Sequence, residues 1–197
     1  MPDFIIQTLW SSFAMTLSSD EINAIHNEAD CLATADQLDQ ALDSMAQDIK
    51  KELADSCPLV LSVMNGGLIP TAQLILKLDF PLELDYLHAT RYGDAVEGAE
   101  LEWKVYPATS IENRTVLVVD DIFDQGHTLE AVCKYLSAKG AKQVLSAVVI
   151  NKLHDRKVDF RPDYIGLEIE DRFLYGFGMD YKGYLRNANG IYAVKGL

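Results

Sequence analysis

Short, almost wholly apolar runs alternate with amphipathic segments along most of the chain, and no other feature constrains its fold as strongly. Apolar runs occupy residues 59–64, 115–119 and 143–150, and further strand-like runs occupy 83–90 and 163–169. Strands that alternate with helices predict a parallel sheet with crossover helices, and near-continuous apolar strands indicate burial on both faces. We therefore predict the α/β class, with an open, doubly wound, mostly parallel sheet and helices on both faces.

The helices of this fold can be placed from their end signals and apolar spacing. Ser18 to Glu21 and Thr34 to Gln37 each have the pattern of a capping box, which opens a helix. A third helix is predicted from about Ile69 to Leu78, and a fourth after residue 128, with Gly140 as its C-cap. The second helix has an apolar stripe at spacings of three and four, made of Leu38, Leu42, Met45, Ile49 and Leu53.

Composition argues against several classes of function. Seventeen basic and 30 acidic residues give a net charge of −13, whereas nucleic-acid binders usually carry a basic face. No apolar run approaches the roughly 18 residues of a membrane span, so we expect neither a nucleic-acid partner nor a membrane. We read no secretory signal in MPDFIIQTLW. Three scattered cysteines without a CxxC pair fit neither a disulfide framework nor a zinc site, and they predict a cytoplasmic location.

The apolar run at 115–119 ends in a concentration of negative charge, at the carboxyl end of a strand where doubly wound sheets bind ligands. The acids alone could cap the next helix or face solvent. Their order with a glycine and a threonine before a helix instead combines hydroxyl acceptors with a phosphate cradle. Neither a GxxxxGK[ST] loop nor a GxGxxG loop is present. The residues concerned are Asp120, Asp121, Asp124, Gly126 and Thr128.

The stretch VLVVDDIFDQGHT resembles the phosphoribosyl-pyrophosphate signature of the type I phosphoribosyltransferases. The resemblance implies that Asp120 and Asp121 accept hydrogen bonds from the ribose 2- and 3-hydroxyls. It also implies that Asp124 is the catalytic group, which accepts the N7 proton of a purine. The 5-phosphate would bind the loop that ends at Thr128, whose other members are Gln125, Gly126 and His127. Family members often have Thr and Lys where this chain has Gln125 and His127.

Two more segments resemble the hypoxanthine-guanine phosphoribosyltransferases, and the similarity extends over about residues 59–186. VMNGG resembles their pyrophosphate loop, which implies that Asn65 and Gly66 lie by the leaving group, although a lysine is more usual at position 65. RYGD resembles their flexible catalytic loop, with Arg91 and Tyr92 in place of the Ser-Tyr pair usual among the animal enzymes. The polar stretch from Arg91 to Trp103 is accordingly expected to be a mobile loop or hairpin that closes over the site.

The C-terminal part resembles the base-binding strand and the hood of the same enzymes. The resemblance of VVINKL implies that Lys152 reads the base; a lysine has donors and no acceptor, so it favours a 6-oxo over a 6-amino purine. From sequence alone a surface lysine and a core phenylalanine remain the alternatives for Lys152 and Phe173. By the same resemblance, Phe173 stacks on the purine, Leu174 offers backbone groups to its edge, Arg186 binds pyrophosphate, and Asp180 ligates Mg²⁺ together with Asp120 and Asp121.

The resemblance implies one phosphoribosyltransferase domain over 1–197: a mainly helical part (1–57), the core sheet (58–160) and a small C-terminal hood (161–197). It implies a purine salvage enzyme that uses phosphoribosyl pyrophosphate, Mg²⁺ and a 6-oxopurine, hypoxanthine or guanine, to make the nucleoside 5-monophosphate, as a homodimer or homotetramer. A xanthine-preferring enzyme, an orotate or uracil enzyme, and a non-enzymatic phosphoribosyl-pyrophosphate-sensing regulator on the same fold are the alternatives.

Overall fold

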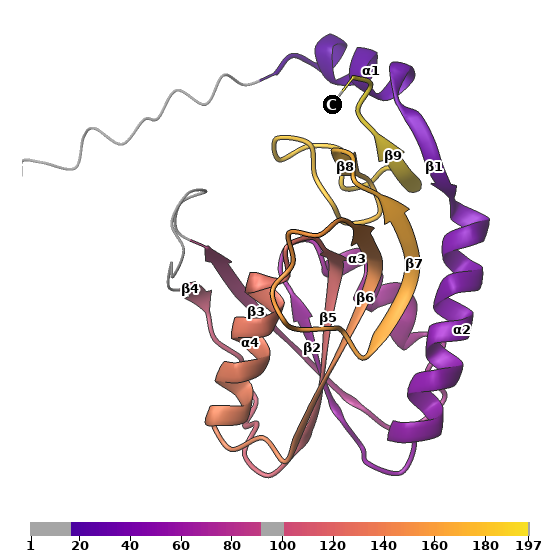
Figure 1. Cartoon of the computed structure of the whole chain (residues 1–197). Coiled ribbons are helices and arrows are strands. Elements are labelled where there is room, and N and C mark those ends of the chain that lie inside the picture. Colours follow the sequence, from indigo (N-terminus) through magenta and orange to yellow (C-terminus); the bar gives the residue numbers. More distant parts are fainter. Residues whose placement is uncertain (1–16, 92–100, 197) are drawn as a thin grey trace, which may run out of the picture.

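The computed structural model describes residues 17–91 and 101–196. Within these ranges, one large sheet has the strand order β4-β3-β2-β5-β6-β7. Neighbouring strands are parallel, except that β4 runs antiparallel to β3 (Figure 1). The open, mostly parallel sheet predicted from the apolar runs is thus confirmed. Its strands are β2 (Leu59–Val63), β3 (Glu83–Arg91), β4 (Leu101–Val105), β5 (Thr115–Phe123), β6 (Gln143–Leu153) and β7 (Tyr164–Glu170).

Helices cover both faces of this sheet, as a doubly wound fold requires. The residues of β5 alternate: Leu117 and Val119 pack with α2 and α3, whereas Val116 and Val118 pack with α4. Figure 1 shows α2 and α4 on opposite sides of the sheet. No helix among the described residues combines the length and the apolarity needed to cross a membrane. The helices that cover the two faces of the sheet are α2 (Ala35–Leu53), α3 (Leu68–Ile75) and α4 (His127–Ala138).

The order of the strands brings two carboxyl ends together at the centre of the sheet. From β2 the chain passes through α3 to β3 on one side, and after β4 it returns to β5 on the other side of β2. It then continues in that direction through α4 to β6. The winding direction therefore reverses between β2 and β5, and such a switch point is where doubly wound sheets bind their ligands.

A second, smaller sheet forms the hood and draws on both ends of the chain. It has the order β1-β9-β8, in which β1 (Asp30–Thr34) pairs antiparallel with β9 (Gly190–Ala193), and β9 pairs with β8 (Leu174–Tyr175). Helix α1 (Ser19–Glu28) precedes β1 and lies over this sheet (Figure 1). The hood is therefore not built from residues 161–197 alone, because its edge strand β1 comes from the part predicted to be mainly helical.

The other domain boundary also differs from the expectation. Strand β7 pairs with β6, so the large sheet extends beyond residue 160, where the hood was predicted to begin. Two predicted helix starts agree with the structure, since Ser18 and Thr34 cap α1 and α2 through capping boxes. The third helix ends at Ile75 and not at Leu78, and the fourth begins at His127. Gly140 follows α4 with a φ of +90°, the left-handed conformation that suits a glycine after a helix.

Candidate active site

Asp120 and Asp121 lie within the last residues of β5, and Asp124 follows directly after the strand. Strand β5 continues to Phe123, and both Asp120 and Ile122 keep their pairing with β6. The backbone N–H of Asp121 donates to Asp120 Oδ1 at 3.0 Å, and that of Ile122 donates to Asp121 Oδ1 at 2.7 Å. The strand and these two bonds hold both carboxylates at the carboxyl edge of the sheet.

Burial raises the pKa values of both Asp120 and Asp121, and the closeness of the two carboxylates adds to the shift at Asp120. Burial and the neighbouring charge of Asp121 raise the pKa of Asp120 well above its usual value. Burial also raises the pKa of Asp121, although its hydrogen bond to Asp120 and the positive charge of Arg186 act in the opposite direction. This edge of the sheet is therefore a place where hydroxyl donors or a cation would be stabilised.

The loop after β5 forms an open helix terminus next to these acids. Gly126 precedes α4 with a φ of +87°, and no side chain caps the helix. A β-carbon at this position would lie 2.4 Å from the ring of Phe123, so only a glycine fits. The free N–H groups of a helix N-terminus bind phosphate readily. A cavity of about 530 Å³ opens here, and among its lining residues are Asp120, Asp121, Asp124, Gln125, Gly126, His127, Thr128 and Asp180.

The loop between β2 and α3 packs directly against the acids. A β-carbon on Gly66 would lie 1.9 Å from Asp121 Oδ2, and one on Gly178 would lie 2.1 Å from the carbonyl oxygen of Gly66. Gly66 thus packs against the carboxylate of Asp121 on one side and against Gly178 of the hood on the other, with no room for a side chain at either glycine. Asn65 lies on the same loop and is exposed, and its peptide bond to Met64 is cis. The predicted pyrophosphate loop therefore adjoins the predicted ribose site.

A second cavity of about 230 Å³ adjoins the first and brings together the residues predicted to bind the base. The ring of Phe173 is 44% exposed, and it contacts Tyr181 edge to face at 5.6 Å between centroids. Leu174 is buried and pairs with Ala193 in the hood sheet. The cavity is lined by Asp121, Ile122, Asp124, Lys152, Phe173, Leu174, Met179 and Asp180.

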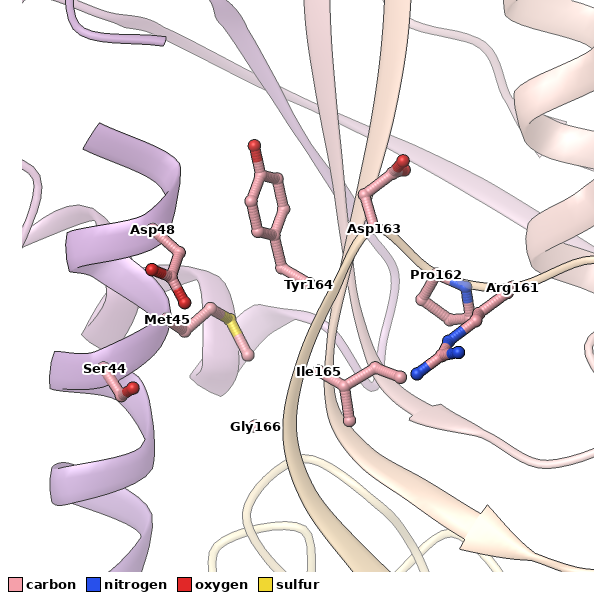
Figure 2. A pocket seen from close by; sticks show the side chains of 9 residues that line it. All are labelled: Ser44, Met45, Asp48, Arg161, Pro162, Asp163, Tyr164, Ile165 and Gly166. Carbon is pink, nitrogen blue, oxygen red and sulfur yellow. The ribbon is translucent and has the colours of Figure 1, made fainter. Parts of the chain in front are cut away.

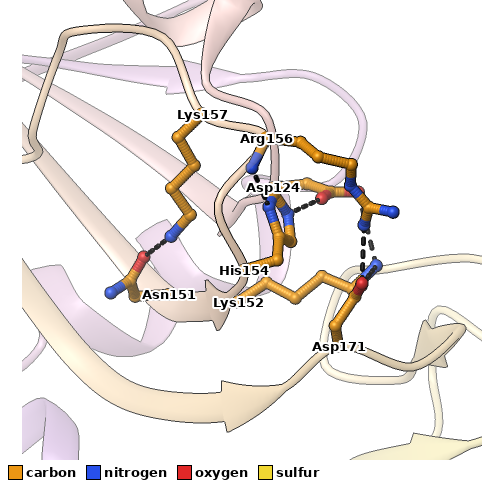
Figure 3. Close-up of polar contacts among 7 residues, drawn as sticks. All are labelled: Asp124, Asn151, Lys152, His154, Arg156, Lys157 and Asp171. Atoms are coloured by element: carbon orange, nitrogen blue, oxygen red, sulfur yellow. Dashed lines mark hydrogen bonds and ion pairs between the residues drawn. The ribbon is translucent and has the colours of Figure 1, made fainter.

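Three side chains that the sequence did not single out join Asp124 and Lys152 in a ring of polar contacts (Figure 3). Lys152 Nζ lies 3.4 Å from Asp124 Oδ2 and 3.1 Å from Asp171 Oδ1. The guanidinium of Arg156 contacts Asp171 Oδ2 at 2.6 Å, and His154 Nε2 contacts Asp124 Oδ1 at 2.6 Å. Lys157, drawn beside this ring, donates to Asn151. No sequence pattern marks His154, because its partner lies 30 residues earlier in the chain.

Ligand atoms of Asp124, His154 and Asp171 lie within 4.8 Å of one another, so they form a conceivable cation site. The ammonium group of Lys152, however, contacts both carboxylates of this group. An ammonium ion in that position already supplies the positive charge that a metal ion would bring. Asp120, Asp121 and Asp180 line one cavity and offer the oxygen ligands that Mg²⁺ prefers, and of these three Asp180 also pairs with Arg186.

The hood residues predicted to face pyrophosphate and metal contact each other. Arg186 pairs with Asp180 Oδ1 at 2.5 Å and donates to the carbonyl oxygen of Gly178 at 2.7 Å. The N–H of Gly183 donates to Asp180 Oδ2 at 2.6 Å. Arg186 is also close enough to act on the pKa of Asp121. The hood therefore places one cation and one carboxylate beside the acidic edge of β5.

The predicted catalytic-loop pair lies at the margin of the described ranges. Arg91 is the last residue of β3, and its backbone pairs with that of Leu101 in β4. The described residues of the stretch, Arg91 and Leu101 to Trp103, lie on the antiparallel neighbours β3 and β4. Tyr92 lies outside the described residues.

A further cavity of about 530 Å³ lies near the amino end of the strand β7, away from the carboxyl ends that hold the acids (Figure 2). It opens between α2, at Ser44 to Asp48, and the amino end of β7, at Tyr164 to Gly166. Ligands of doubly wound sheets bind at the carboxyl ends of the strands. The cavity beside the acids of β5 is therefore the candidate active site, although the two cavities have the same volume.

Comparison with known proteins agrees with this geometry. The family model described as phosphoribosyl transferase domain matches residues 30–182. The hypoxanthine-guanine phosphoribosyltransferase of Bacillus subtilis is 29% identical over 86% of this chain and 95% of its own length. That of Lactococcus lactis is 31% identical over 83% of this chain and 90% of its own length.

Solved structures show the same similarity. A hypoxanthine phosphoribosyltransferase from Staphylococcus aureus has a TM-score of 0.83 at 25% identity, over 87% of this chain and 95% of the other. A hypoxanthine-guanine-xanthine phosphoribosyltransferase has a TM-score of 0.77 at 27% identity, over 84% and 96%. The chain therefore belongs to the phosphoribosyl transferase domain family, as a type I phosphoribosyltransferase of the hypoxanthine-guanine group.

Proposed function

We propose that the protein transfers the 5-phosphoribosyl group from phosphoribosyl pyrophosphate to hypoxanthine and guanine. The observation that carries this proposal is the pair of adjoining cavities that share Asp121, Asp124 and Asp180. One cavity has the acids and the helix terminus that suit a ribose phosphate, and the other has the lysine and aromatic ring that suit a 6-oxopurine. The relatives are named as enzymes, which favours this function over a non-enzymatic regulator.

The ribose phosphate would bind along β5 and the start of α4. Asp120 and Asp121 accept hydrogen bonds from the two ribose hydroxyls, and these donors replace the water that burial removes. The 5-phosphate is held by the N–H groups that open α4 and by the hydroxyl of Thr128. Gln125 and His127 contribute backbone N–H groups, which do not depend on side-chain identity.

The base would bind between Phe173 and the ammonium group of Lys152. Stacking of a base on an aromatic ring is worth about 1–3 kcal/mol. Lys152 donates to the carbonyl oxygen at C6 of the purine, and the backbone of Leu174 contacts the purine edge. The side chain of Lys152 is 12% exposed, and its two contacts to carboxylates, of Asp124 and Asp171, exceed 3.0 Å. Both contacts are longer than the roughly 2.7–2.9 Å of a charge-assisted hydrogen bond, so the carbonyl oxygen of the base would replace the weaker one, to Asp124.

In the reaction, N9 of the purine forms a bond to C1 of the ribose while the bond from C1 to the pyrophosphate oxygen breaks. Positive charge develops on the ribose and negative charge on the leaving pyrophosphate. Arg186, with the backbone of Asn65 and Gly66, stabilises the leaving group, and electrostatic effects of this kind are usually large. Asp124 takes the proton from N7. Asp180 with Asp120 and Asp121 would hold Mg²⁺, which when bound would neutralise further charge at the phosphates.

The assembly is proposed as a homodimer or homotetramer in the cytoplasm. Large apolar side chains are exposed just after α3, where Leu76 is 83% exposed, and on β3, where Leu84 is 50% exposed. Leu84 and Tyr86 alternate with the buried Leu87 and Ala89, which pack on the α4 side. They therefore point to the same face of the sheet as α3. A second copy of the chain would cover this apolar surface.

The function is tested by incubating the purified protein with phosphoribosyl pyrophosphate, Mg²⁺ and hypoxanthine, and following inosine monophosphate by chromatography. Product should form with equimolar pyrophosphate, and chelation of the metal by EDTA should stop the reaction. Omission of the base serves as the control for simple hydrolysis. Absence of nucleotide at saturating substrates, from a protein with intact secondary structure, would contradict the proposed function.

A further inference from the structure

The carboxylate of Asp124 is held at one oxygen by a buried histidine that lies one residue beyond β6. His154 Nε2 and Asp124 Oδ1 are 2.6 Å apart, and the histidine side chain is only 6% exposed. The Asp124 side chain is 46% exposed, so its other oxygen faces the cavity. A contact this short to a carboxylate belongs to the charge-assisted hydrogen bonds, which are about twice as strong as neutral ones.

The other ring nitrogen identifies the tautomer. The backbone N–H of Arg156 donates to His154 Nδ1 at 3.1 Å, so Nδ1 carries no proton. The proton of the neutral ring is therefore on Nε2, from which it is donated to Asp124. Because Nε2 is already protonated and Nδ1 is occupied by a donor, the ring has no free acceptor for a proton from the substrate. His154 can orient Asp124 but does not relay its proton.

The second oxygen of Asp124 is held much less firmly. Lys152 Nζ lies 3.4 Å from Oδ2, and it is closer to Asp171 at 3.1 Å. In the proposed function the ammonium group turns to the carbonyl oxygen of the base. During the reaction, His154 then becomes the donor that keeps the plane of the Asp124 carboxylate fixed and directs Oδ2 towards the purine N7.

We propose that His154 is a positioning residue for the proton acceptor Asp124, an inference that rests on the proposed function of Asp124. The ring Arg156–His154–Asp124–Lys152–Asp171 returns to Arg156 through the guanidinium pair of 2.6 Å. The same short segment after β6 therefore positions both the acceptor and the lysine (Figure 3). Misplacement of a reacting group by about 1 Å can lower a rate by about 10²-fold.

Two substitutions of similar size separate the hydrogen bond from packing. His154→Gln keeps an N–H donor at about the distance of Nε2, whereas His154→Met fills similar space without a donor. We expect His154→Met to lower kcat about 10–100-fold, with the KM for phosphoribosyl pyrophosphate within about twofold of the parent. His154→Gln should keep kcat within about threefold of the parent. Steady-state kinetics with hypoxanthine gives both constants.

A purely structural role for His154 would lower the melting temperature of both variants and leave kcat per folded molecule unchanged. That result, or an equal loss of kcat in the Gln and Met variants, would overturn the inference. If the Met variant does not fold, His154→Leu provides a second variant without a donor. In an Asp124→Asn background, His154→Met should change kcat by less than about twofold, since the oriented group is already gone. A parent protein without activity would instead contradict the proposed function, and it is measured first.

Discussion

Gly66 and Asp121 are packed so closely that a β-carbon on Gly66 would lie 1.9 Å from Asp121 Oδ2. The two residues belong to the loops and strands on either side of the switch point, at the ends of β2 and β5. The predicted pyrophosphate loop and the predicted ribose acceptor are thus one packed unit. The effects on stability of substitutions at the two residues should therefore be coupled.

Gly66→Ala should lower stability by about 1–3 kcal/mol through overpacking, and most of this cost should vanish when Asp121 is also Ala. Thermal and urea unfolding of the two single variants and the double variant measure the coupling. Gly67→Ala is the matched control, because its β-carbon would meet the carbonyl oxygens of Val119 and Val63 at 2.7 Å. Its cost should persist in the Asp121→Ala background. Strict additivity of the stability effects of Gly66→Ala and Asp121→Ala would contradict direct packing of Gly66 against Asp121.

Asp124→Asn should fold normally and lose most of its turnover, because the change is nearly isosteric and removes the proton acceptor. General-base contributions are commonly about 10²–10⁴-fold. The measurement is kcat with saturating hypoxanthine and phosphoribosyl pyrophosphate. Asp159→Asn, the same change at an exposed acid of the β6–β7 connection, should behave like the parent. A kcat within threefold of the parent for Asp124→Asn would remove Asp124 from this role.

Phosphoribosyl pyrophosphate with Mg²⁺ should raise the melting temperature, because a ligand at 100 times its dissociation constant adds about 2.7 kcal/mol. Replacement of both Asp120 and Asp121 by Ala removes the ribose acceptors and should abolish the shift. Differential scanning fluorimetry with and without ligand gives the result. A full shift in the double variant would mean that these acids do not hold the ribose.

The raised pKa of Asp120 predicts a pH dependence for the ligand-free protein. A carboxyl whose pKa is raised on folding binds its proton more tightly in the folded state. Its contribution to the free energy of unfolding is therefore most favourable at low pH. That contribution is lost as the pH rises through the folded-state pKa. Asp120→Asn should therefore raise the melting temperature more at pH 8 than at pH 5. An equal or smaller gain in melting temperature at pH 8 would contradict the raised pKa of Asp120.

Cys133 should be unreactive in the folded protein. It packs on the inner face of α4, and burial raises the pKa of its thiol to about 12, so almost no thiolate forms at pH 8. Cys31 and Cys57 are exposed. Titration with a thiol reagent at pH 8 should modify two cysteines quickly and the third only in denaturant. Rapid modification of all three without denaturant would show that α4 does not shield Cys133.

Much of the central sheet and of its ligand edge could be predicted, because both depend on local patterns. Apolar runs marked β2, β5 and β6, and capping boxes at Ser18 and Thr34 marked the helix starts. The order of acids, glycine and threonine after residue 119 reflects a backbone requirement, which the φ of +87° at Gly126 bears out. Such features can be read within a window of a few residues.

The remaining features depend on contacts between distant parts of the chain. The hood pairs Asp30 with Ala193, and nothing in the short strand β1 indicates its partner. His154 was missed for the same reason, because a single histidine after a strand gives no sign of the carboxylate that it contacts. The role of β7 in the large sheet likewise depends on its pairing with β6.

The most direct test of the account is a comparison of kcat/KM for hypoxanthine, guanine, xanthine, adenine and uracil, with the parent protein and with Lys152→Met. With adenine, the ammonium of Lys152 would face another donor, and a site built around such a bond can reject the wrong analogue by as much as about 10⁴-fold. The parent should use hypoxanthine and guanine far better than adenine or uracil, and Lys152→Met should lose most of that activity and reduce the ratio over adenine. A parent that prefers adenine or uracil would contradict the account, and an unchanged hypoxanthine-to-adenine ratio in Lys152→Met would exclude Lys152 from base selection.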